Sequence, residues 1–316
     1  MLQAFKYSQN KIHIIKEKTN ESLKDAVWID INEPSKKEMA LISKVSSLPV
    51  PTLEEIQEIE SSSHYESYEN GFQLNCLFLQ LIGRDDNSNA NVLFLVSQDK
   101  VITICQNEVP ELRLLRTYLK KNILKPHTPK EIFLKLMEMK IDRIADTLED
   151  SYKRLNKIGK NVLSVDSSGI EDAIEDLAQE DDTLGMVRLC LMDTQRDMLI
   201  LQKRKSKWLQ DDKEEISDIL TDIDTLMPHN TFLSEKTDFL MNAAQGFINI
   251  QQNKIIKIFS IASVVFLPPT MIASIYGMNF RFMPELHWEF GYPFALLLIV
   301  ISGIAPYLFF KKKGWL

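Results

Sequence analysis

The sequence predicts an α+β cytoplasmic domain followed by long helices and two C-terminal transmembrane helices. Residues 1–125 contain short β-branched and aromatic runs separated by turn-rich stretches, which is typical of strands. From Pro129 onward, apolar residues recur with a period near 3.6, which indicates long amphipathic helices. Residues 258–276 and 291–310 carry no charge, and each stretch is long enough to cross a hydrocarbon core of about 30 Å.

The first domain, residues 1–125, is expected to be a sheet covered by helices. Strands are expected where β-branched and aromatic residues cluster, at 26–31, 72–82, 91–97 and 100–106. Amphipathic stretches, expected as covering helices, lie at 34–46, 52–60 and 109–121. The first 18 residues alternate charged and apolar side chains and lack the basic-then-apolar pattern of a signal peptide, so this domain should stay in the cytoplasm.

Three long helices should follow this domain. They are expected over 129–163, over 170–207, and from about Lys213 with no strong stop before Gly277. Pro228 should kink the third helix rather than end it. The expected parts are antiparallel cytoplasmic helices over 126–210, a stalk helix continuing into the first span over 211–276, an outer loop over 277–290, a second span over 291–310 and a basic tail over 311–316.

Composition and motifs exclude several classes of function. The net charge of −7 disfavours nucleic acid as a partner, because phosphate binding needs a basic face. The sequence contains no nucleotide-binding, metalloprotease or serine-hydrolase motif, so we expect no catalytic residues and no enzyme activity. Cys76, Cys105 and Cys190 are widely spaced and form no CxxC pair, so we expect reduced, buried thiols rather than metal ligands.

The charges that flank the two spans predict their orientation. Lys254 and Lys257 precede the first span, and three lysines follow the second: Lys311, Lys312 and Lys313. The loop over 277–290 carries Arg281 and two acids. Because positive charge accumulates on the cytoplasmic side, both termini should be cytoplasmic and the loop should lie outside, in contact with the outer face of the lipid bilayer.

A stripe of mostly polar residues runs along the first span. Its members recur at spacings of three and four: Asn253, Ile256, Ser260, Ser263, Leu267, Thr270 and Ser274. A seven-residue repeat keeps one seam of a helix facing a common axis. Polar residues inside a membrane face a bundle interior or a water-filled path, although small hydroxyls also simply allow close helix packing. Two spans cannot enclose a conduit, so a pore would require an oligomer.

The sequence resembles the bacterial CorA magnesium transporters. The resemblance covers the chain, including "VRLCLMDTQR", and is carried most densely by "GFINIQQNKIIKIFSIASVVFLPPT", "YGMNF", "MPEL", "GYP" and "FFKKKGWL". It implies a funnel-shaped homopentamer in the cell inner membrane, with the first span lining the pore and the second outside it. Members commonly carry an acid directly after "GMNF", where this chain has Arg281.

The resemblance gives the loop a role in ion selection. Magnesium gives up its waters reluctantly, so a selective mouth should recognise the hydrated ion. Five Asn279 carboxamides could offer neutral oxygens to first-shell waters and still release the ion. Gly277 is expected in a left-handed turn that ends the helix, and Met278 is expected to pack the loop. With Arg281 in place of an acid, Glu285 and Glu289 would have to attract cations.

Gating and regulation can be assigned to further residues. Leu267 and Ile256 could form an apolar constriction that closes by dewetting, and Thr270 and Asn253 could form polar rings for the hydrated ion. The lysines at 311–313 would place a basic collar around the cytoplasmic exit.

The resemblance also implies cytoplasmic carboxylates that bind magnesium weakly and hold the funnel shut. Asp218 and Asp222 on the stalk are the candidates. No covalent cofactor is expected, and Mg²⁺ would be both the transported and the regulatory ion.

The predicted function is passive, potential-driven uptake of magnesium, with cobalt and nickel as further candidate ions. The alternative is the same architecture transporting zinc or another divalent metal, which the absence of His and Cys from the stripe disfavours. A membrane-tethered sensor or scaffold would leave the polar stripe unexplained. A membrane-bound hydrolase would need a nucleophile or metal cluster, and the sequence shows neither.

Overall fold

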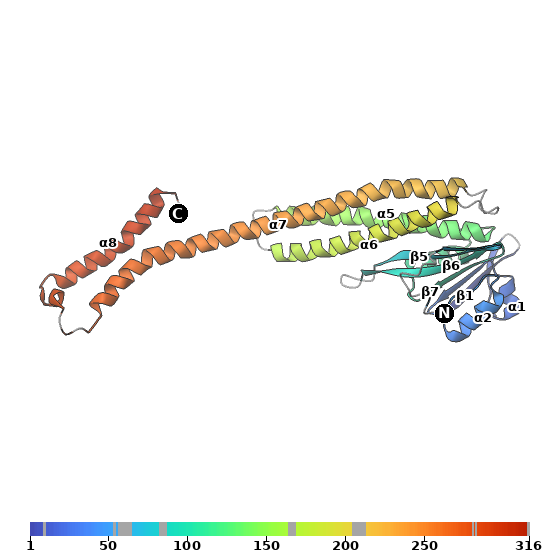
Figure 1. The fold of residues 1–316 in the computed structure, drawn as a ribbon, viewed down its shortest axis with the longest axis horizontal. Coiled ribbons are helices and arrows are strands. Elements are labelled where there is room, and N and C mark those ends of the chain that lie inside the picture. The colour runs from blue at the N-terminus through green and yellow to red at the C-terminus, as the bar shows by residue number, and fades with distance from the viewer. Residues whose placement is uncertain are drawn as a thin grey trace. The chain divides into compact units, whose positions relative to one another are not determined.

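The β-branched and aromatic runs near the N-terminus pair into a mixed sheet in the computed structural model (Figure 1). The structure describes residues 1–8, 11–52, 55, 65–81, 87–163, 169–203, 213–279, 281 and 283–314. The strands within these residues are β1 Leu2–Ser8, β2 Lys11–Ile14, β3 Trp28–Asn32, β4 Tyr65–Tyr68, β5 Gly71–Leu81, β6 Asn87–Ser97 and β7 Val101–Cys105. Their order in the sheet is β2-β1-β3-β7-β6-β5-β4; β3 and β7 are parallel, and the other neighbours are antiparallel.

Helices cover both faces of this sheet (Figure 1). The helices of the described cytoplasmic region are α1 Asn20–Lys24, α2 Lys36–Val45, α4 Pro110–Lys120, α5 Pro129–Val162, α6 Ile170–Lys203 and the first part of α7 Lys213–Tyr276. Alternate side chains of β6 point to opposite faces. Leu93 joins the core under α1 and α2, whereas the Phe94 ring lies edge-on to Phe133 of α5, with ring centroids 5.4 Å apart. The sheet is therefore the middle of three layers.

Most of the predicted elements of this domain are confirmed. The predicted strands correspond to β3, β5, β6 and β7, and two of the predicted covering helices correspond to α2 and α4. The helix expected over 52–60 falls almost entirely outside the described residues. Strands β1, β2 and β4 and helix α1 were not predicted. Strand β2 is only four residues long and has only Ile12 buried, so its alternation is too short to mark it as a strand.

A buried polar chain fixes α4 against the centre of the sheet. Trp28 Nε1 donates to Thr103 Oγ1 (3.1 Å), and Thr103 Oγ1 donates to Asp30 Oδ1 (2.6 Å). Arg116 of α4 forms an ion pair with Asp30 and another with Glu108. A buried carboxylate is tolerated where such partners compensate its lost hydration. Strands β3 and β7 and helix α4 are thus joined at one point.

The stretch "VRLCLMDTQR" in α6 has a structural role of the same kind. Asp193 Oδ2 accepts a hydrogen bond from the Leu77 backbone N–H (2.8 Å), and the Cys76 thiol donates to Asp197 Oδ2 (3.3 Å). Lys140 Nζ of α5 lies 4.0 Å from Asp193 Oδ2. All five residues belong to α5, α6 or β5, so these contacts hold the two long helices on the sheet.

The cysteines are buried free thiols, as the sequence predicted. Burial raises the pKa of Cys105 and of Cys190 to about 12. Burial, together with the nearby Asp197 carboxylate, raises the pKa of Cys76 well above its ordinary value. A neutral thiol is a poor nucleophile and a poor metal ligand, so these three side chains act as small core residues.

Helices α5, α6 and the first part of α7 form a bundle in the first unit, in which α6 runs antiparallel to the other two. Helix α5 starts at the predicted residue, where Thr128 accepts from the Glu131 backbone N–H and Pro129 occupies the first turn. Lys236 Nζ of α7 donates to Asn156 Oδ1 of α5 (2.6 Å), and Gln195 Nε2 of α6 donates to Asp224 Oδ1 of α7 (2.9 Å).

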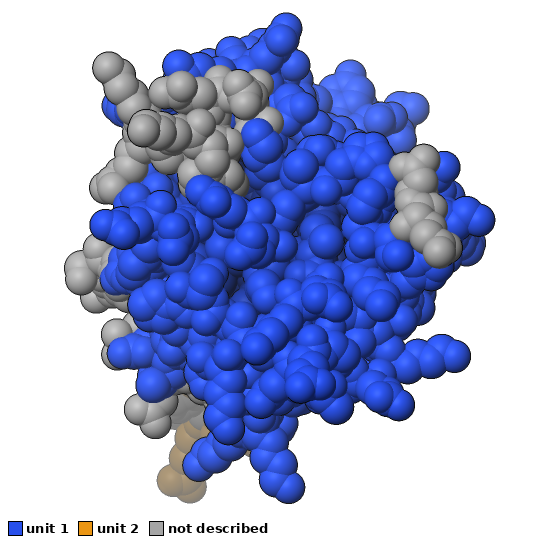
Figure 2. Space-filling model, turned by 90° about the vertical axis from the view of Figure 1, so that its right-hand side faces the viewer, with its two compact units in different colours: residues 1–241 blue, residues 242–316 orange. Residues whose placement is uncertain are grey.

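Helix α7 is continuous from Lys213 to Tyr276, so the prediction that Pro228 does not end it is confirmed. The end of the helix predicted over 170–207 lies partly outside the described residues, because α6 is described to Lys203. By its internal contacts the chain forms two compact units, residues 1–241 and 242–316, and the first fills the view in Figure 2.

Gly71 is required where β5 passes close to β6. A Cβ built at Gly71 would lie 2.1 Å from the carbonyl oxygen of Val96, which is backbone and cannot move aside cheaply. We predict that Gly71→Ala lowers the free energy of unfolding of the cytoplasmic unit by about 1–3 kcal/mol, the usual range for overpacking. Thermal unfolding of the full chain, followed by circular dichroism, measures the change.

Gly185→Ala is the matched control. Gly185 lies exposed in α6, and nothing lies within 4 Å of the position that a Cβ would take there, so alanine should be neutral or stabilising by up to about 1 kcal/mol. Equal effects of the two substitutions would contradict the steric explanation.

Candidate functional site

Both predicted spans are helices in the structure. Helix α7 (Lys213–Tyr276) and helix α8 (Gly291–Lys312) are each long and apolar enough to cross a membrane. The apolar part of α7 begins after Lys257, and α8 ends in the basic residues Lys311 and Lys312. The part of α7 from residue 242 onward, helix α8 and the loop between them belong to the second unit.

The polar stripe occupies one exposed face of α7. Its predicted members are all exposed in the chain by itself: Asn253, Ile256, Ser260, Ser263, Leu267, Thr270 and Ser274. The half-buried residues of the same segment lie elsewhere on the helix: Ile261, Ala262, Val265, Pro268, Pro269 and Ile272.

Helix α8 lies on the side of α7 that carries these half-buried residues. A Cβ built at Gly303 of α8 would be 3.3 Å from Pro269 Cγ and 3.9 Å from the Val265 carbonyl oxygen. Val265 follows Ser263 by two residues, which is about 200° around an α-helix. The stripe and α8 are therefore on opposite sides of α7.

Two hydroxyls of the stripe donate their hydrogens to the backbone of α7 itself. Ser263 Oγ donates to the Phe259 carbonyl oxygen (2.9 Å), and Thr270 Oγ1 donates to the Phe266 carbonyl oxygen (2.7 Å). A hydroxyl has one donor and two acceptor lone pairs, so each of these oxygens keeps acceptor capacity. The exposed face can thus accept hydrogen bonds from water without displacing the helix's own bonds.

The end of α7 differs from the prediction at Gly277. The Gly277 N–H bonds to the Ala273 carbonyl (2.9 Å) and the Met278 N–H to the Ile275 carbonyl (3.2 Å). The last turn therefore tightens into an i→i−3 hydrogen bond, and Gly277 does not have the positive φ that was expected. The expected left-handed turn is wrong, because the tightened turn satisfies the last carbonyls without one.

The other predicted site residues of the loop that the structure describes are exposed in the single chain. Asn279, Arg281 and Glu289 are exposed. Met278 is 47% exposed, so the packing expected for it is not made within one chain. Glu285 lies in the short 3₁₀ helix η2 Pro284–His287, and its side chain is outside what the structure describes.

The two ends of α8 have opposite chemical character. At its start the Trp288 ring lies 5.7 Å from Phe294 and 6.3 Å from Phe290, centroid to centroid. Such aromatic groups are common where a span meets the membrane surface. At its other end, the exposed lysines at 311–313 lie beside the helix carboxyl end, where positive charge is favourable.

The predicted regulatory acids lie on the water-exposed side of the stalk. Asp218 and Asp222 are exposed, whereas Ile216, Ile219 and Ile223 of the same turns are buried. Among the described residues, no group of three or more His, Cys, Asp or Glu side chains is arranged to hold a metal ion. The two acids are therefore not brought into a complete site by the described residues of one chain.

Sequence reasoning missed two further acids that lie near carboxylates of α7. Partial desolvation, together with the carboxylates of Glu138, Asp146 and Asp222, raises the pKa of Asp142 on α5. Partial desolvation and the carboxylates of Asp238 and Asp182 likewise raise the pKa of Asp181 on α6. No local pattern identifies these pairs, because each one joins two different helices.

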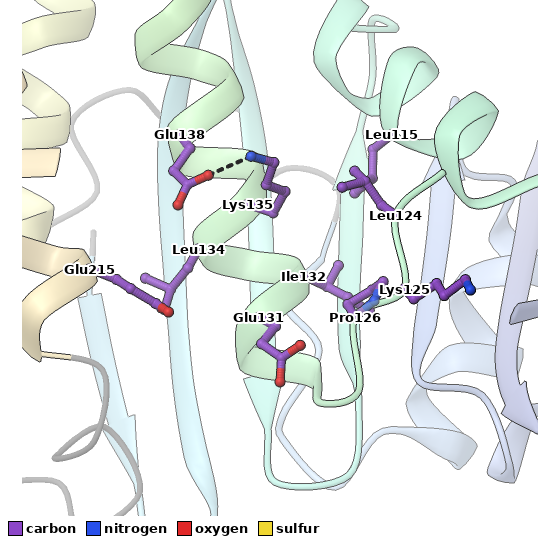
Figure 3. A pocket seen from close by; sticks show the side chains of 10 residues that line it. All are labelled: Leu115, Leu124, Lys125, Pro126, Glu131, Ile132, Leu134, Lys135, Glu138 and Glu215. Atoms are coloured by element: carbon purple, nitrogen blue, oxygen red, sulfur yellow. Dashed lines mark hydrogen bonds and ion pairs between the residues drawn. The ribbon is translucent and has the colours of Figure 1, made fainter. Parts of the chain in front are cut away.

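A pocket of about 250 Å³ at the start of α5 contains none of the predicted site residues (Figure 3). Glu131 on its wall accepts from the His127 N–H (2.9 Å) and from Thr128 Oγ1 (3.0 Å). Lys135 Nζ pairs with Glu138 Oε2 (2.6 Å, dashed line in Figure 3). These polar groups stabilise the helix start, so we assign the pocket no functional role.

A cytoplasmic α/β unit, a long helical bundle and two terminal spans, one with a polar face, define a membrane transport protein. The chain belongs to the family of CorA-like Mg²⁺ transporter proteins, whose family model matches residues 24–312. The resemblance inferred from the sequence is thereby confirmed. The chain is an inner-membrane transport protein and not an enzyme.

Individual relatives match this chain over its full length. The chain is 40% identical over 317 residues to the magnesium transport protein CorA of Salmonella typhimurium, covering 100% of both proteins. It is 39% identical to the protein of the same name from Escherichia coli K12, again with complete coverage. The structure of the CorA magnesium transporter from Methanocaldococcus jannaschii has the same fold (TM-score 0.80, 18% identity), covering 100% of this chain and 99% of that one.

Proposed function

We propose that this chain assembles into a homopentameric, funnel-shaped channel for passive uptake of hydrated magnesium ions. The observation that carries the proposal is the polar stripe of α7, which is exposed in the single chain and lies opposite α8. In a member of the magnesium transporter family, such a face on a membrane helix is best explained as the wall of a shared pore.

An oligomer follows from the exposure of this stripe. Polar side chains such as Ser263 and Thr270 are unfavourable against lipid, and equivalent faces from several copies around one axis would shield them. The expected outcome is a mass of five chains for the protein in mild detergent and in lipid, measured by native mass spectrometry. A monomer or dimer under both conditions would contradict the pore.

The proposed arrangement divides the chain by environment. The cytoplasm would contain residues 1–125, the helices over 126–210, and the lower part of the stalk over 211–276. The loop over 277–290 would be periplasmic, followed by the second span over 291–310 and the tail over 311–316. The basic residues on both sides of the spans support this orientation, with both termini in the cytoplasm.

The chemistry of the stripe suits a hydrated divalent ion. Hydroxyl oxygens of Ser263 and Thr270 can accept hydrogen bonds from first-shell water, as can the amide oxygen of Asn253. Neutral acceptors bind weakly enough to release the ion. Ile256 and Leu267 would form the apolar constriction between these rings, where loss of water closes the pore.

The mouth and the exit would be formed by the two ends of the spans. Five Asn279 side chains would select the hydrated ion above Gly277 and Met278, and Glu285 and Glu289 would attract cations despite Arg281. At the other end, lysines 311–313 of five chains would form a basic collar. The exposed side chains of Asn279, Glu289 and Lys311 are compatible with these roles.

The same architecture carrying zinc is the alternative. Zinc favours His and Cys ligands, whereas magnesium favours oxygen, and the stripe contains neither His nor Cys. Magnesium is therefore the proposed cargo, and cobalt and nickel are further candidates to be compared in the same flux measurement.

Uptake should depend on the membrane potential alone. Moving one charge through 100 mV is worth ~2.3 kcal/mol, so a divalent ion gains ~4.6 kcal/mol, equivalent to a gradient of about three orders of magnitude. We predict that liposomes containing the purified protein load magnesium under an inside-negative potential, without ATP or a pH gradient. A fluorescent magnesium indicator inside the liposomes measures uptake. A requirement for nucleotide or protons would contradict the channel mechanism.

In the same liposomes, Asn279→Ala should reduce magnesium uptake by more than about tenfold. Each lost hydrogen bond is worth about 0.5–1.5 kcal/mol, and the ring would lose five at once. Assembly should be unchanged, because Asn279 is exposed and contributes to no core. Normal conduction by a correctly assembled variant would show that selection occurs elsewhere.

Closure by cytosolic magnesium should depend on the stalk carboxylates. Asp218 shares the seven-residue repeat position of Asn253, and Asp222 lies near enough to Asp142 to perturb it, so a divalent ion near these acids would relieve repulsion. We predict that Asp218→Asn with Asp222→Asn raises the internal magnesium needed for half-closure by about fivefold or more, the lower end of typical coupling energies. Patch-clamp current at defined internal magnesium measures this.

The control pair is Glu17→Gln with Glu21→Gln, two exposed acids at the same spacing in the N-terminal region. It removes the same charge and should leave closure unchanged. An equal shift in both pairs would indicate a general charge effect and not a sensor on the stalk.

A further inference from the structure

A groove of about 450 Å³ lies between the two spans at their lysine-bearing end. Its walls are mostly apolar and are formed by Ile258, Ile261, Ala262, Val265 and Phe266 of α7 and by Tyr307 of α8. Lys254 and Lys257 line one end of it. The groove lies entirely within the second unit, so it is a property of that unit alone.

The shape of the groove follows from two residues of α8. Gly303 has no side chain, and α8 therefore comes close to Pro269 of α7 at that level. Tyr307 is one turn further along the same face of α8 and brings a large ring, which holds the helices apart. The groove therefore opens between the Gly303–Pro269 contact and the end of the spans that carries the lysines.

The groove and the polar stripe are on opposite faces of α7. Ile258 and Ser260 differ by two residues, as do Ile261 and Ser263, and each step of two is about 200° around the helix. Any assembly that turns the stripe toward a central axis turns this groove outward. The groove is therefore open to the bilayer, and its occupant must come from there.

The charges at the end of the groove favour an anion. The residues that line the groove include two lysines and no acid. Lys311 follows Tyr307 by one turn on the same face of α8 and adds positive charge at the same end. Lysine side chains at the end of a span extend their ammonium groups to the level of the lipid head groups, while their stems stay in apolar surroundings.

We infer that this groove binds one anionic phospholipid, with an acyl chain along the apolar wall and the phosphate between Lys254 and Lys257. Basic pockets between spans on the cytoplasmic side are known to suit such head groups, and each lysine near the surface contributes about fivefold to binding. The inference rests on the proposed assembly, which turns the groove outward, but not on magnesium passing through the stripe.

A second copy of this chain fits the groove less well. Between Asp238 and Glu285 the sequence has no acidic residue, and it has none after Glu289. The spans of a neighbouring copy could therefore cover the apolar wall but would bring no acidic side chain to the level of Lys254 and Lys257. A lipid phosphate supplies that missing charge.

The test measures lipid retention by the full-length protein in a neutral detergent. Native mass spectrometry is used to titrate phosphatidylglycerol and phosphatidylcholine with identical acyl chains. We expect saturable binding of phosphatidylglycerol, and about 30-fold weaker binding after Lys254→Gln with Lys257→Gln. Lys157→Gln with Lys160→Gln, an exposed pair at the same spacing on α5, should leave binding unchanged.

A second variant keeps the charges and fills the groove. Ala262→Phe places a ring among the lining residues, and it should also abolish phosphatidylglycerol binding while leaving membrane insertion intact. This variant guards against the case in which the lysine substitutions merely disturb insertion.

Three outcomes would overturn the inference. Equal binding of phosphatidylcholine, which carries a phosphate but no net charge, would show that the groove does not select an anionic head group. Full binding by Ala262→Phe would show attraction to surface charge without a groove. A change in the number of subunits with unchanged lipid content, after substitution of Lys254 and Lys257, would show that the groove is a contact between copies.

Discussion

Helix α7 imposes the constraint on which the rest of the structure depends. One continuous helix must pack against α5 and α6 in water and then cross the membrane, and it does both with a seven-residue repeat. Ile216, Ile223 and Asn230 occupy one buried position of this repeat, and Ile258 and Val265, which line the groove beside α8, continue it. The residues of the stripe occupy other positions of the same seven-residue repeat. A slip of the repeat by one residue would rotate the side chains by about 100° and would place apolar residues where the stripe now lies.

Contacts within the first unit fix the positions of the helices against which α7 packs. Strand β5 and helices α5 and α6 are held together by Asp193, Asp197 and Lys140, which are buried and which use charge-assisted contacts rather than apolar packing alone. Such contacts are strongly destabilising when one partner is removed, so they fix one arrangement of the helices on the sheet. The acids that lie near carboxylates of α7, Asp142 and Asp181, are then presented to the stalk by helices whose positions are already set.

In the second unit, two opposite faces of α7 suit two different environments. The stripe side offers hydroxyl oxygens whose hydrogens are already bonded to the helix backbone, so it can be wetted at little energetic cost. The groove side is apolar and ends in lysines, which suits an acyl chain below a charged head group. A helix with these two faces is best placed between a column of water and the bilayer. The proposed association around the water side and the proposed exposure of the groove to lipid would therefore both follow from the same sequence pattern.

The sequence by itself determined the long helices, the spans, the stripe and the Gly277-Met278-Asn279 loop, because these depend on local periodicity and on residues adjacent in the chain. Strands β1 and β2 were not identified in this way, since β2 is only four residues long and β1 is placed in the sheet by its non-local pairing with β3. Only the tertiary structure showed that Asp222 lies near Asp142, that Gly277 ends α7 without a left-handed turn, and that Gly303 and Tyr307 shape a groove beside Lys254. Each of these depends on backbone geometry or on the distance between separate helices, and a linear pattern of residue types specifies neither.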